Sequence, residues 1–252
     1  MVVFDTQVTS EHLRAGGVPD GVAVTSTTLQ EIFGMQGAGN TRNRFYLPLM
    51  KDEYQLHHYA HLHAERKGDR RRIRPHTDRL IINFAADHPT VVEYSHSATC
   101  RLLELSRRRL DAGFQVFAAH ARPALTKATF ANVRTHYRSL SASSARYVAL
   151  ATETVDVALS LLPRFTREYN LKNDFRDSLN DLLILATAIR MNETLHTRDQ
   201  VLSDFAVTVA QAEVSSRTDG RFEVSFRDPS AVRRVNSESK GYINLGWRVH
   251  RR

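Results

Sequence analysis

Short β-branched segments alternate with helical patterns along the chain, and this alternation restricts the fold more than any other feature. Val2–Phe4 and Val22–Val24 are short, apolar and bounded by polar residues, as buried strands are. Residues 194–197 form a third candidate strand, which follows a long helical pattern. Strands that alternate with helices predict an α/β fold, with a doubly wound, mostly parallel central sheet flanked by helices.

The middle of the chain has weaker patterns. Residues 54–65 and 93–111 have the apolar spacing of helices, whereas residues 80–84 fit either a strand or a buried helix segment. Residues 114–117 weakly favour a strand. Farther along, the apolar spacing predicts a long helix that ends near Pro163, because proline interrupts helical hydrogen bonding.

Composition excludes several classes of protein. The 252 residues are enough for one large domain, and 42% hydrophobic with 25% charged residues excludes a wholly disordered or collagen-like chain. The single cysteine, Cys100, excludes an intrachain disulfide, so a cytoplasmic location is expected. No apolar run approaches the roughly 20 residues of a membrane span, and the first ten residues lack the pattern of a signal peptide. We therefore expect no membrane association.

Positive charge is concentrated in one part of the chain. The formal net charge is +8, and residues 65–146 hold 16 basic and 7 acidic residues, a balance of +9. The remaining residues have a balance of −1. A concentrated basic region favours a polyanionic partner, most simply RNA or DNA, although many basic regions are only solvated surface.

Four acidic residues occupy positions that such a sheet brings together. Asp5 ends the first strand, and Asp199 follows the strand at 194–197. Glu31 and Asp181 are expected in the first turns of helices that follow strand or loop segments. Clustered carboxylates repel one another, and a hard cation such as Mg²⁺ or Mn²⁺ offsets that charge with oxygen ligands. Such a metal site is suited to phosphodiester hydrolysis.

Other residues have two interpretations each. Thr28-x-x-Glu31 fits a capping box as well as a metal site, and Gly34 is expected to end that helix. Asp177, four residues before Asp181, either extends the metal site or pairs with an arginine. Thr197 either supports the site or is an ordinary strand threonine.

Two clusters of basic residues are candidate binding groups. His57 and His61 would share a helical face, but no cysteine or further spaced ligand supports zinc, so a solvated or RNA-facing surface is favoured. A run of arginines is expected to contact phosphates or to form a solvated face. Its members are Arg70, Arg71, Arg72 and Arg74.

Four segments resemble PIN-domain nucleases, most closely the toxin-type, VapC-like branch. They are Val2–Thr6, Ser26–Gly34, Asn180–Ala188 and Leu195–Asp199. The family pattern has an Asp after the first strand, a Glu in a Thr-x-x-Glu helix start, an Asp before an Ile-Ala-Ala-like helix, and an Asp after Thr-x at a later strand end. All four motifs occur here in that order.

The resemblance implies a metal-dependent endoribonuclease with one or two Mg²⁺ or Mn²⁺ ions. Asp5, Glu31, Asp181 and Asp199 would form the acidic set, with Thr6 and Thr197 as supporting residues. It also implies a toxin neutralised by a cognate antitoxin, or a relative in phage defence, and homodimers are common in such families.

The resemblance also sets the expected domain boundaries. It covers residues 1–34 and 143–206, so the nuclease domain is expected at 1–206, interrupted by a basic, largely helical insertion at about 35–142. Residues 207–252 are expected to form a C-terminal extension with a strand at 222–226 and a basic, loosely held tail at 247–252.

The sequence leaves alternative functions open. A phosphatase with Asp5 as nucleophile predicts a second Asp two residues later, but Gln7 occupies that position. A non-catalytic nucleic-acid-binding protein with a degraded site is a further alternative, which the intact set of four acids disfavours. DNA also remains open as a substrate, because contacts to the 2′-hydroxyl of RNA are not visible in a sequence.

Overall fold

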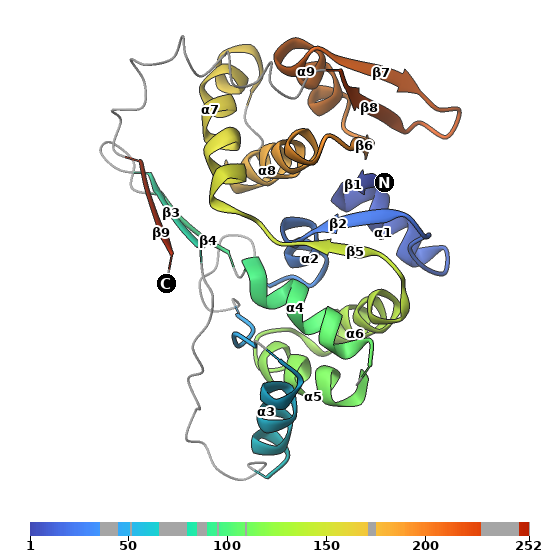
Figure 1. Cartoon of the computed structure of the whole chain (residues 1–252), viewed down its shortest axis with the longest axis vertical. Coiled ribbons are helices and arrows are strands. Elements are labelled where there is room, and N and C mark those ends of the chain that lie inside the picture. Colours follow the sequence, from blue (N-terminus) through green and yellow to red (C-terminus); the bar gives the residue numbers. More distant parts are fainter. Residues whose placement is uncertain are drawn as a thin grey trace.

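A computed structural model of the chain shows a central sheet flanked by helices (Figure 1). It describes residues 1–35, 45–50, 52–65, 80–84, 90–94, 96–108, 110–170, 175–227 and 247–251. The helices are α1 (Thr6–Arg14), α2 (Ser26–Ile32), α3 (Glu53–Glu65), α4 (His96–Ser106), α5 (Leu110–Ala121), α6 (Lys127–Ala142), α7 (Thr152–Glu168), α8 (Phe175–Met191) and α9 (Gln200–Ala210). The strands are β1 (Val2–Phe4), β2 (Val22–Thr25), β3 (Leu80–Phe84), β4 (Thr90–Tyr94), β5 (Arg146–Val148), β6 (Thr194–Thr197), β7 (Ala212–Ser216), β8 (Phe222–Phe226) and β9 (Trp247–Arg251).

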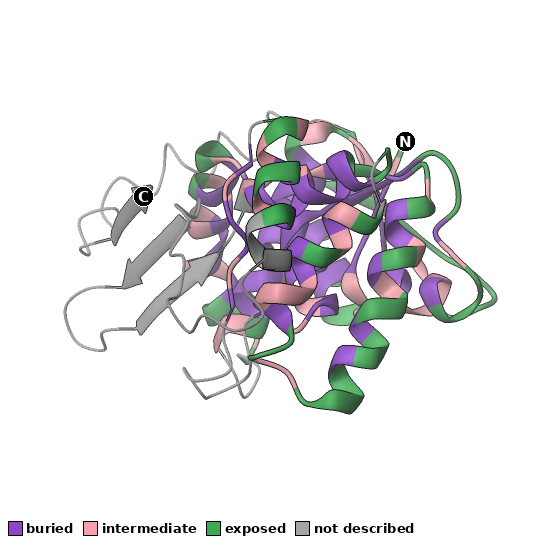
Figure 2. Cartoon of the chain, turned by 90° about the horizontal axis from the view of Figure 1, so that it is seen from below, coloured by how far each residue is buried: buried purple, intermediate pink, exposed green. Residues whose placement is uncertain are grey.

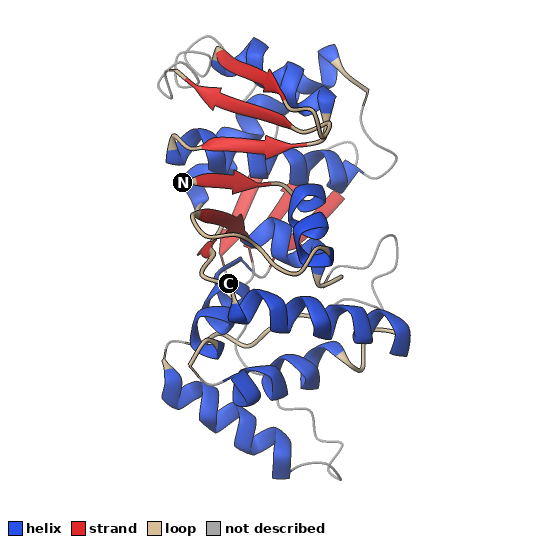
Figure 3. Cartoon of the chain, turned by 90° about the vertical axis from the view of Figure 1, so that its right-hand side faces the viewer, coloured by secondary structure: helices blue, strands red, loops and turns tan. Residues whose placement is uncertain are grey.

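The main sheet has six strands in the order β5-β2-β1-β6-β8-β7. The first four are parallel, and β8 and β7 form an antiparallel hairpin beside β6 (Figure 3). This confirms the predicted α/β class and the mostly parallel sheet. The chain passes from β1 outward to β2 and β5 and then returns to the other side of β1 as β6. The strand order therefore reverses between β1 and β6, and sheets of this kind bind ligands beyond the carboxyl ends of the strands at that point.

Alternate residues of the strands pack on opposite faces of the sheet. Val3, Ala23 and Leu195 are fully buried and belong to a core cluster with α7, α8 and α9. Phe4 and Val24 point the other way and belong to a second cluster with α1, α2 and the helices α3 to α6. Figure 2 shows the buried residues gathered in the strands and on the helix sides that face them. Alternation with a period of two residues thus builds a three-layer core.

The helices α3 to α6 form a group beside β5, at the end of the molecule away from β7 (Figures 1 and 3). These helices lie within the region expected as a largely helical insertion at about 35–142. Within the same region, residues 80–84 form β3 rather than a helix. A second, three-stranded sheet has the order β4-β3-β9.

Four expectations from the sequence are wrong. The helix expected at 93–111 is divided, because residues 93 and 94 belong to β4 and α4 ends at Ser106. Residues 114–117 lie inside α5, because their bulky side chains pack on one side of a helix as well as in a strand. The helix α7 continues through Pro163, since Leu161, Leu162 and Phe165 keep its apolar face buried on both sides of the proline. The tail at 247–251 pairs with β3 as β9, a partner too far away in the chain to be seen locally.

The C-terminal region contains more strands than expected. The strand at 222–226 is present as β8. Two further strands occur in this region: β7, which precedes β8 and pairs with it, and β9, which follows β8 in the sequence and pairs with β3. No helix in the described part of the chain is both long and apolar enough to cross a bilayer.

Gly113 provides a test of the packing between α4, α5 and α6. A Cβ at this position would lie 1.7 Å from Ser106 Oγ and 3.1 Å from the Tyr137 hydroxyl. We expect Gly113→Ala to lower the free energy of unfolding by about 1–3 kcal/mol, despite alanine's higher helix propensity. Thermal or urea unfolding would measure this, and a Ser106→Gly/Gly113→Ala double variant should recover part of the loss. An unchanged stability of Gly113→Ala would contradict this packing.

Candidate active site

Asp5 joins the ends of the two strands between which the strand order reverses. It follows β1 and caps α1, because its Oδ1 accepts a hydrogen bond from the Val8 backbone N–H at 2.7 Å. Its Oδ2 accepts from the Thr197 hydroxyl at 2.6 Å and from the Arg198 backbone N–H at 3.3 Å. The side chain is 6% exposed. Asp5 therefore lies where parallel sheets bind ligands, as predicted.

Thr197 connects Asp5 to a second carboxylate. The fully buried Thr197 hydroxyl donates to Asp5 and accepts a hydrogen bond from the Asp199 backbone N–H at 2.9 Å. Asp199 caps α9, with its Oδ1 accepting from the Leu202 backbone N–H at 3.0 Å. The structure thus brings Asp5 and Asp199 together through Thr197.

Glu31 lies in the last turn of α2, not in the first turn as expected. Thr25 is the N-cap of this helix and accepts a hydrogen bond from the Thr28 backbone N–H at 3.1 Å, so the capping box of Thr28 and Glu31 does not form. Gly34 ends the helix with a φ of 59°, and the Gly34 and Met35 N–H groups donate back to the Glu31 and Gln30 carbonyl oxygens at 3.0 Å each. A capping role therefore does not explain Glu31.

Two polar side chains hold the Glu31 carboxylate. The Thr6 hydroxyl donates to Oε2, and the Asn180 side-chain N–H donates to Oε1 at 2.7 Å. Thr6 follows Asp5 directly, and Asn180 is a buried residue of α8. Glu31 is thereby fixed beside the first residue of α1, so contacts across three helices connect it to the pair of Asp5 and Asp199.

The helix α8 brings two further acids toward this cluster. Asp181 lies in the second turn of α8, not in the first turn as expected. It is half-buried and follows Asn180, whose side chain contacts Glu31. Asp177 is exposed, and its negative charge contributes to raising the pKa of Glu31. Asn180 was not predicted from the sequence, although an amide in an otherwise apolar, buried helical run is a signal that it has a specific partner.

Burial disfavours the charged form of both central carboxylates, so it makes Asp5 and Glu31 weaker acids. Removal of water raises the pKa of Asp5, and the neighbouring charge of Asp199 acts in the same direction, against hydrogen bonds from Thr197, Val8 and Arg198. Burial likewise raises the pKa of Glu31, against hydrogen bonds from Thr6 and Asn180. The site therefore concentrates negative charge in a partly dehydrated place, which a bound cation would relieve.

The donor atoms fit a hard divalent cation in kind, because carboxylate and hydroxyl oxygens are what Mg²⁺ and Mn²⁺ prefer. Within the described ranges, no three His, Cys, Asp or Glu side chains are grouped as ligands of one ion. The carboxylates are instead oriented by N–H and hydroxyl donors of the protein. These contacts leave lone pairs on the oxygens of Asp5 and Glu31 for a further partner.

Of the other predicted groups, the arginine run Arg70, Arg71, Arg72 and Arg74 lies outside the described residues. His57 and His61 are exposed on α3.

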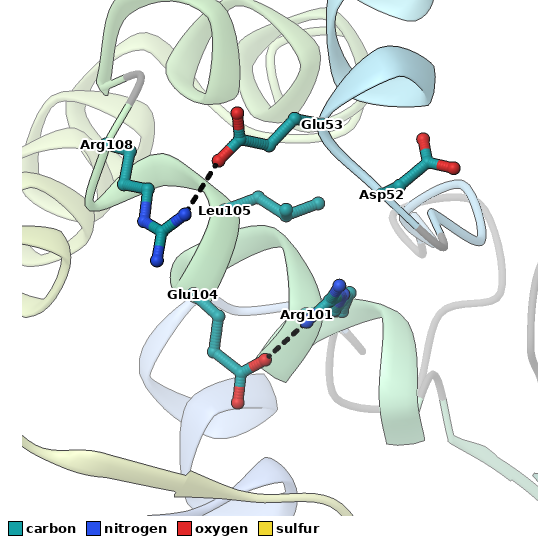
Figure 4. A pocket seen from close by; sticks show the side chains of 6 residues that line it. All are labelled: Asp52, Glu53, Arg101, Glu104, Leu105 and Arg108. Carbon is teal, nitrogen blue, oxygen red and sulfur yellow. Dashed lines mark hydrogen bonds and ion pairs between the residues drawn. The ribbon is translucent and has the colours of Figure 1, made fainter.

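A pocket of about 430 Å³ lies apart from the acidic cluster, between α4 and the start of α3 (Figure 4). Four of its five charged side chains pair with one another: Glu53 lies 3.5 Å from Arg108, and Glu104 lies 3.2 Å from Arg101. The fifth, Asp52, accepts a hydrogen bond from the Gln55 backbone N–H at 2.9 Å. Because these opposite charges offset each other, the pocket does not favour a particular class of ligand. The chemistry of the acidic cluster, not this pocket, identifies the candidate site.

Comparison with known proteins adds no relative: no family model matches the chain, and neither a curated protein nor a solved structure is significantly similar to it.

The half-buried charge of Glu31 predicts a pH-dependent cost in stability. A raised pKa means that native Glu31 binds its proton more tightly than the unfolded chain does, so the contribution of Glu31 to stability falls as pH rises from the unfolded value of about 4 through its raised native pKa. Glu31→Gln keeps an acceptor for Asn180 and a partner for Thr6 without the charge. We expect the variant to have a higher Tm at pH 7.5, at about 2–4 °C per kcal/mol gained, and no advantage at pH 4.

The matched control is Asp204→Asn, which changes an exposed acid of α9. A Tm difference between Glu31→Gln and wild type that does not grow with pH would contradict a buried, destabilising charge at Glu31.

Proposed function

We propose that the chain is a metal-dependent endoribonuclease of the PIN type. The observation that carries this proposal is the network Asn180–Glu31–Thr6 and Asp5–Thr197–Asp199 at the carboxyl ends of β1 and β6. Three of the four acids named by the family resemblance belong to it, and the fourth, Asp181, adjoins Asn180. The concentration of basic residues elsewhere in the chain fits a phosphate-containing substrate.

Helix capping alone does not account for this arrangement. Asp5 and Asp199 both cap helices, but a capping oxygen works equally well on a solvated side chain. Dehydration of Asp5 beside Asp199, and of Glu31 in the last turn of its own helix, disfavours their charged forms, which costs stability and raises the pKa of both residues. Such costs are common at catalytic sites, where carboxylates are held for a substrate or a cation.

Each residue of the network has a distinct role in the proposed reaction. Asp5, Glu31, Asp181 and Asp199 would hold one or two Mg²⁺ or Mn²⁺ ions, with Asp177 close enough to add negative charge. The bound cation supplies Lewis acidity for attack of water on the scissile phosphate. Thr197 orients Asp5 toward the site and fixes the backbone of Asp199, while Thr6 and Asn180 hold the two oxygens of Glu31.

The biological role follows from the resemblance alone. It favours a toxin of a toxin–antitoxin or phage-defence system, with a cognate antitoxin and a homodimeric assembly as the corresponding partners. RNA is the proposed substrate, and DNA is compared with it in the assay below.

The direct test is cleavage of labelled single-stranded and structured RNA, with DNA alongside, in Mn²⁺, Mg²⁺ or EDTA. We expect metal-dependent cleavage of RNA, reduced at least about 100-fold in Asp5→Asn and Asp181→Asn because each removes a charged ligand. Asp204→Asn should cleave like wild type. Cleavage that survives both site variants, or RNA binding without any cleavage, would contradict the proposal.

Asn180 should act by positioning Glu31. Asn180→Ala removes the donor to Oε1, and loss of such an orienting partner typically lowers metal affinity or activity about 10–100-fold. We expect the Mn²⁺ concentration that gives half-maximal cleavage to rise, with partial rescue at high Mn²⁺. A fall in Tm with an unchanged Mn²⁺ dependence would indicate a structural role only.

A further inference from the structure

A long stretch of the sequence that includes α6 contains no acidic residue. Between Asp111 and Glu153 the chain has no Asp or Glu, whereas it has five Lys or Arg residues. They are Arg122, Lys127, Arg134, Arg138 and Arg146. In a chain with 25% charged residues, every Asp, Glu, Lys or Arg position within this segment is therefore a Lys or Arg.

Three of these cations lie along one face of α6. Lys127, Arg134 and Arg138 are separated by seven and four residues, so they share one side of the helix. They extend over about 16 Å at about 1.5 Å per residue. All three are exposed, and none forms an ion pair with a carboxylate of the described residues. The opposite, apolar side of α6 is buried against α5 and α4.

Aromatic rings hold two arginines in place. The Arg138 guanidinium lies 5.3 Å from the centre of the Phe114 ring, and the Arg122 guanidinium lies 5.2 Å from that of Phe130. Stacking on a ring restricts the guanidinium while leaving its N–H edge available to a phosphate. Arg122 precedes α6, so the oriented cations continue past the start of the helix.

The start of α6 lies close to the acidic site. A Cβ built on Gly34 would lie 3.7 Å from Leu125 Cδ2, just before α6, and Gly34 is three residues after Glu31. The helix lies at the outer edge of the helical group beside β5 (Figure 1). A chain bound along α6 therefore leads toward the end of α2 that carries Glu31.

The surface chemistry distinguishes a nucleic acid from other polyanionic partners. None of the exposed large hydrophobic residues in the described part of the chain lies on α6. A protein interface normally has aromatic or aliphatic anchors at its centre, and a membrane-binding helix needs a solvent-exposed apolar face. The α6 surface has neither, because its apolar side is buried in the core.

We propose that the α6 surface, defined as Arg122, Lys127, Arg134 and Arg138, binds the phosphate backbone of a nucleic acid. The inference rests on the proposed function in that this nucleic acid is the substrate of the acidic site. It adds a binding surface on and before α6, separate from the carboxylates.

The test measures binding of a fluorescent single-stranded RNA to the full-length chain with Asp5→Asn in EDTA, so that cleavage does not interfere. We expect Lys127→Gln/Arg134→Gln/Arg138→Gln to weaken binding at least about tenfold at 0.15 M salt. The slope of log affinity against log salt should fall by about 2, since each single-strand phosphate contact contributes about 0.7. Single-stranded DNA, run alongside, shows whether the sugar matters.

A matched control removes the same charge elsewhere. Arg167→Gln/Arg190→Gln/Arg227→Gln changes three exposed arginines, two of which pair with Glu153 and Glu213. This control should keep its affinity and slope, as should Lys127→Arg/Arg134→Lys/Arg138→Lys, which retains the charges of α6. Thermal unfolding of each variant checks that the fold is intact.

An unchanged affinity of the α6 triple variant would overturn the inference. An equal loss in the control would overturn it as well, because it would reflect net charge alone. Preferential binding of wild type to anionic vesicles, with no α6-dependent RNA binding, would also overturn it. RNA that binds through α6 and is never cleaved would instead count against the proposed nuclease and leave this inference standing.

Discussion

The hydrogen bond from the Thr197 hydroxyl to Asp5 is the contact on which the candidate site depends. It joins the carboxyl ends of β1 and β6, neighbouring parallel strands far apart in the sequence, at 2.6 Å in a buried environment. The same two side chains set the starts of two helices, since Asp5 caps α1 and Thr197 fixes the backbone of Asp199, the cap of α9. Strand pairing, helix direction and carboxylate position are therefore coupled in one place.

This coupling has an energetic cost that the rest of the fold offsets. Burial is the main reason that the pKa values of Asp5 and Glu31 are raised, and the neighbouring charges of Asp199 and Asp177, respectively, act in the same direction. Hydrogen bonds from Thr6, Thr197 and Asn180 recover part of the lost hydration. The two apolar clusters on either face of the sheet supply the stability that tolerates such a site.

Charge is divided between two parts of the molecule. The sheet's carboxyl edge gathers acids, whereas the helices packed beside β5 present arginines and one lysine along α6. The same helix buries Phe130 and Tyr137 in the core, so one element both stabilises the insertion and displays its charge. An acidic centre close to a basic surface suits a polyanionic substrate, because the surface attracts phosphates that the acids would repel without a cation.

The sequence by itself determined the elements whose pattern is local. Val2–Phe4, the strand at 194–197 and the Gly34 helix end follow from side-chain alternation and turn chemistry, and Asp5 and Asp199 follow from their places at strand ends. Only the tertiary structure decided that Glu31 meets Thr6 and Asn180, 25 and 149 residues away, and that it does so from the last turn of its helix. Those contacts depend on how α2 and α8 pack around the sheet, and packing is set by the whole core rather than by any local pattern.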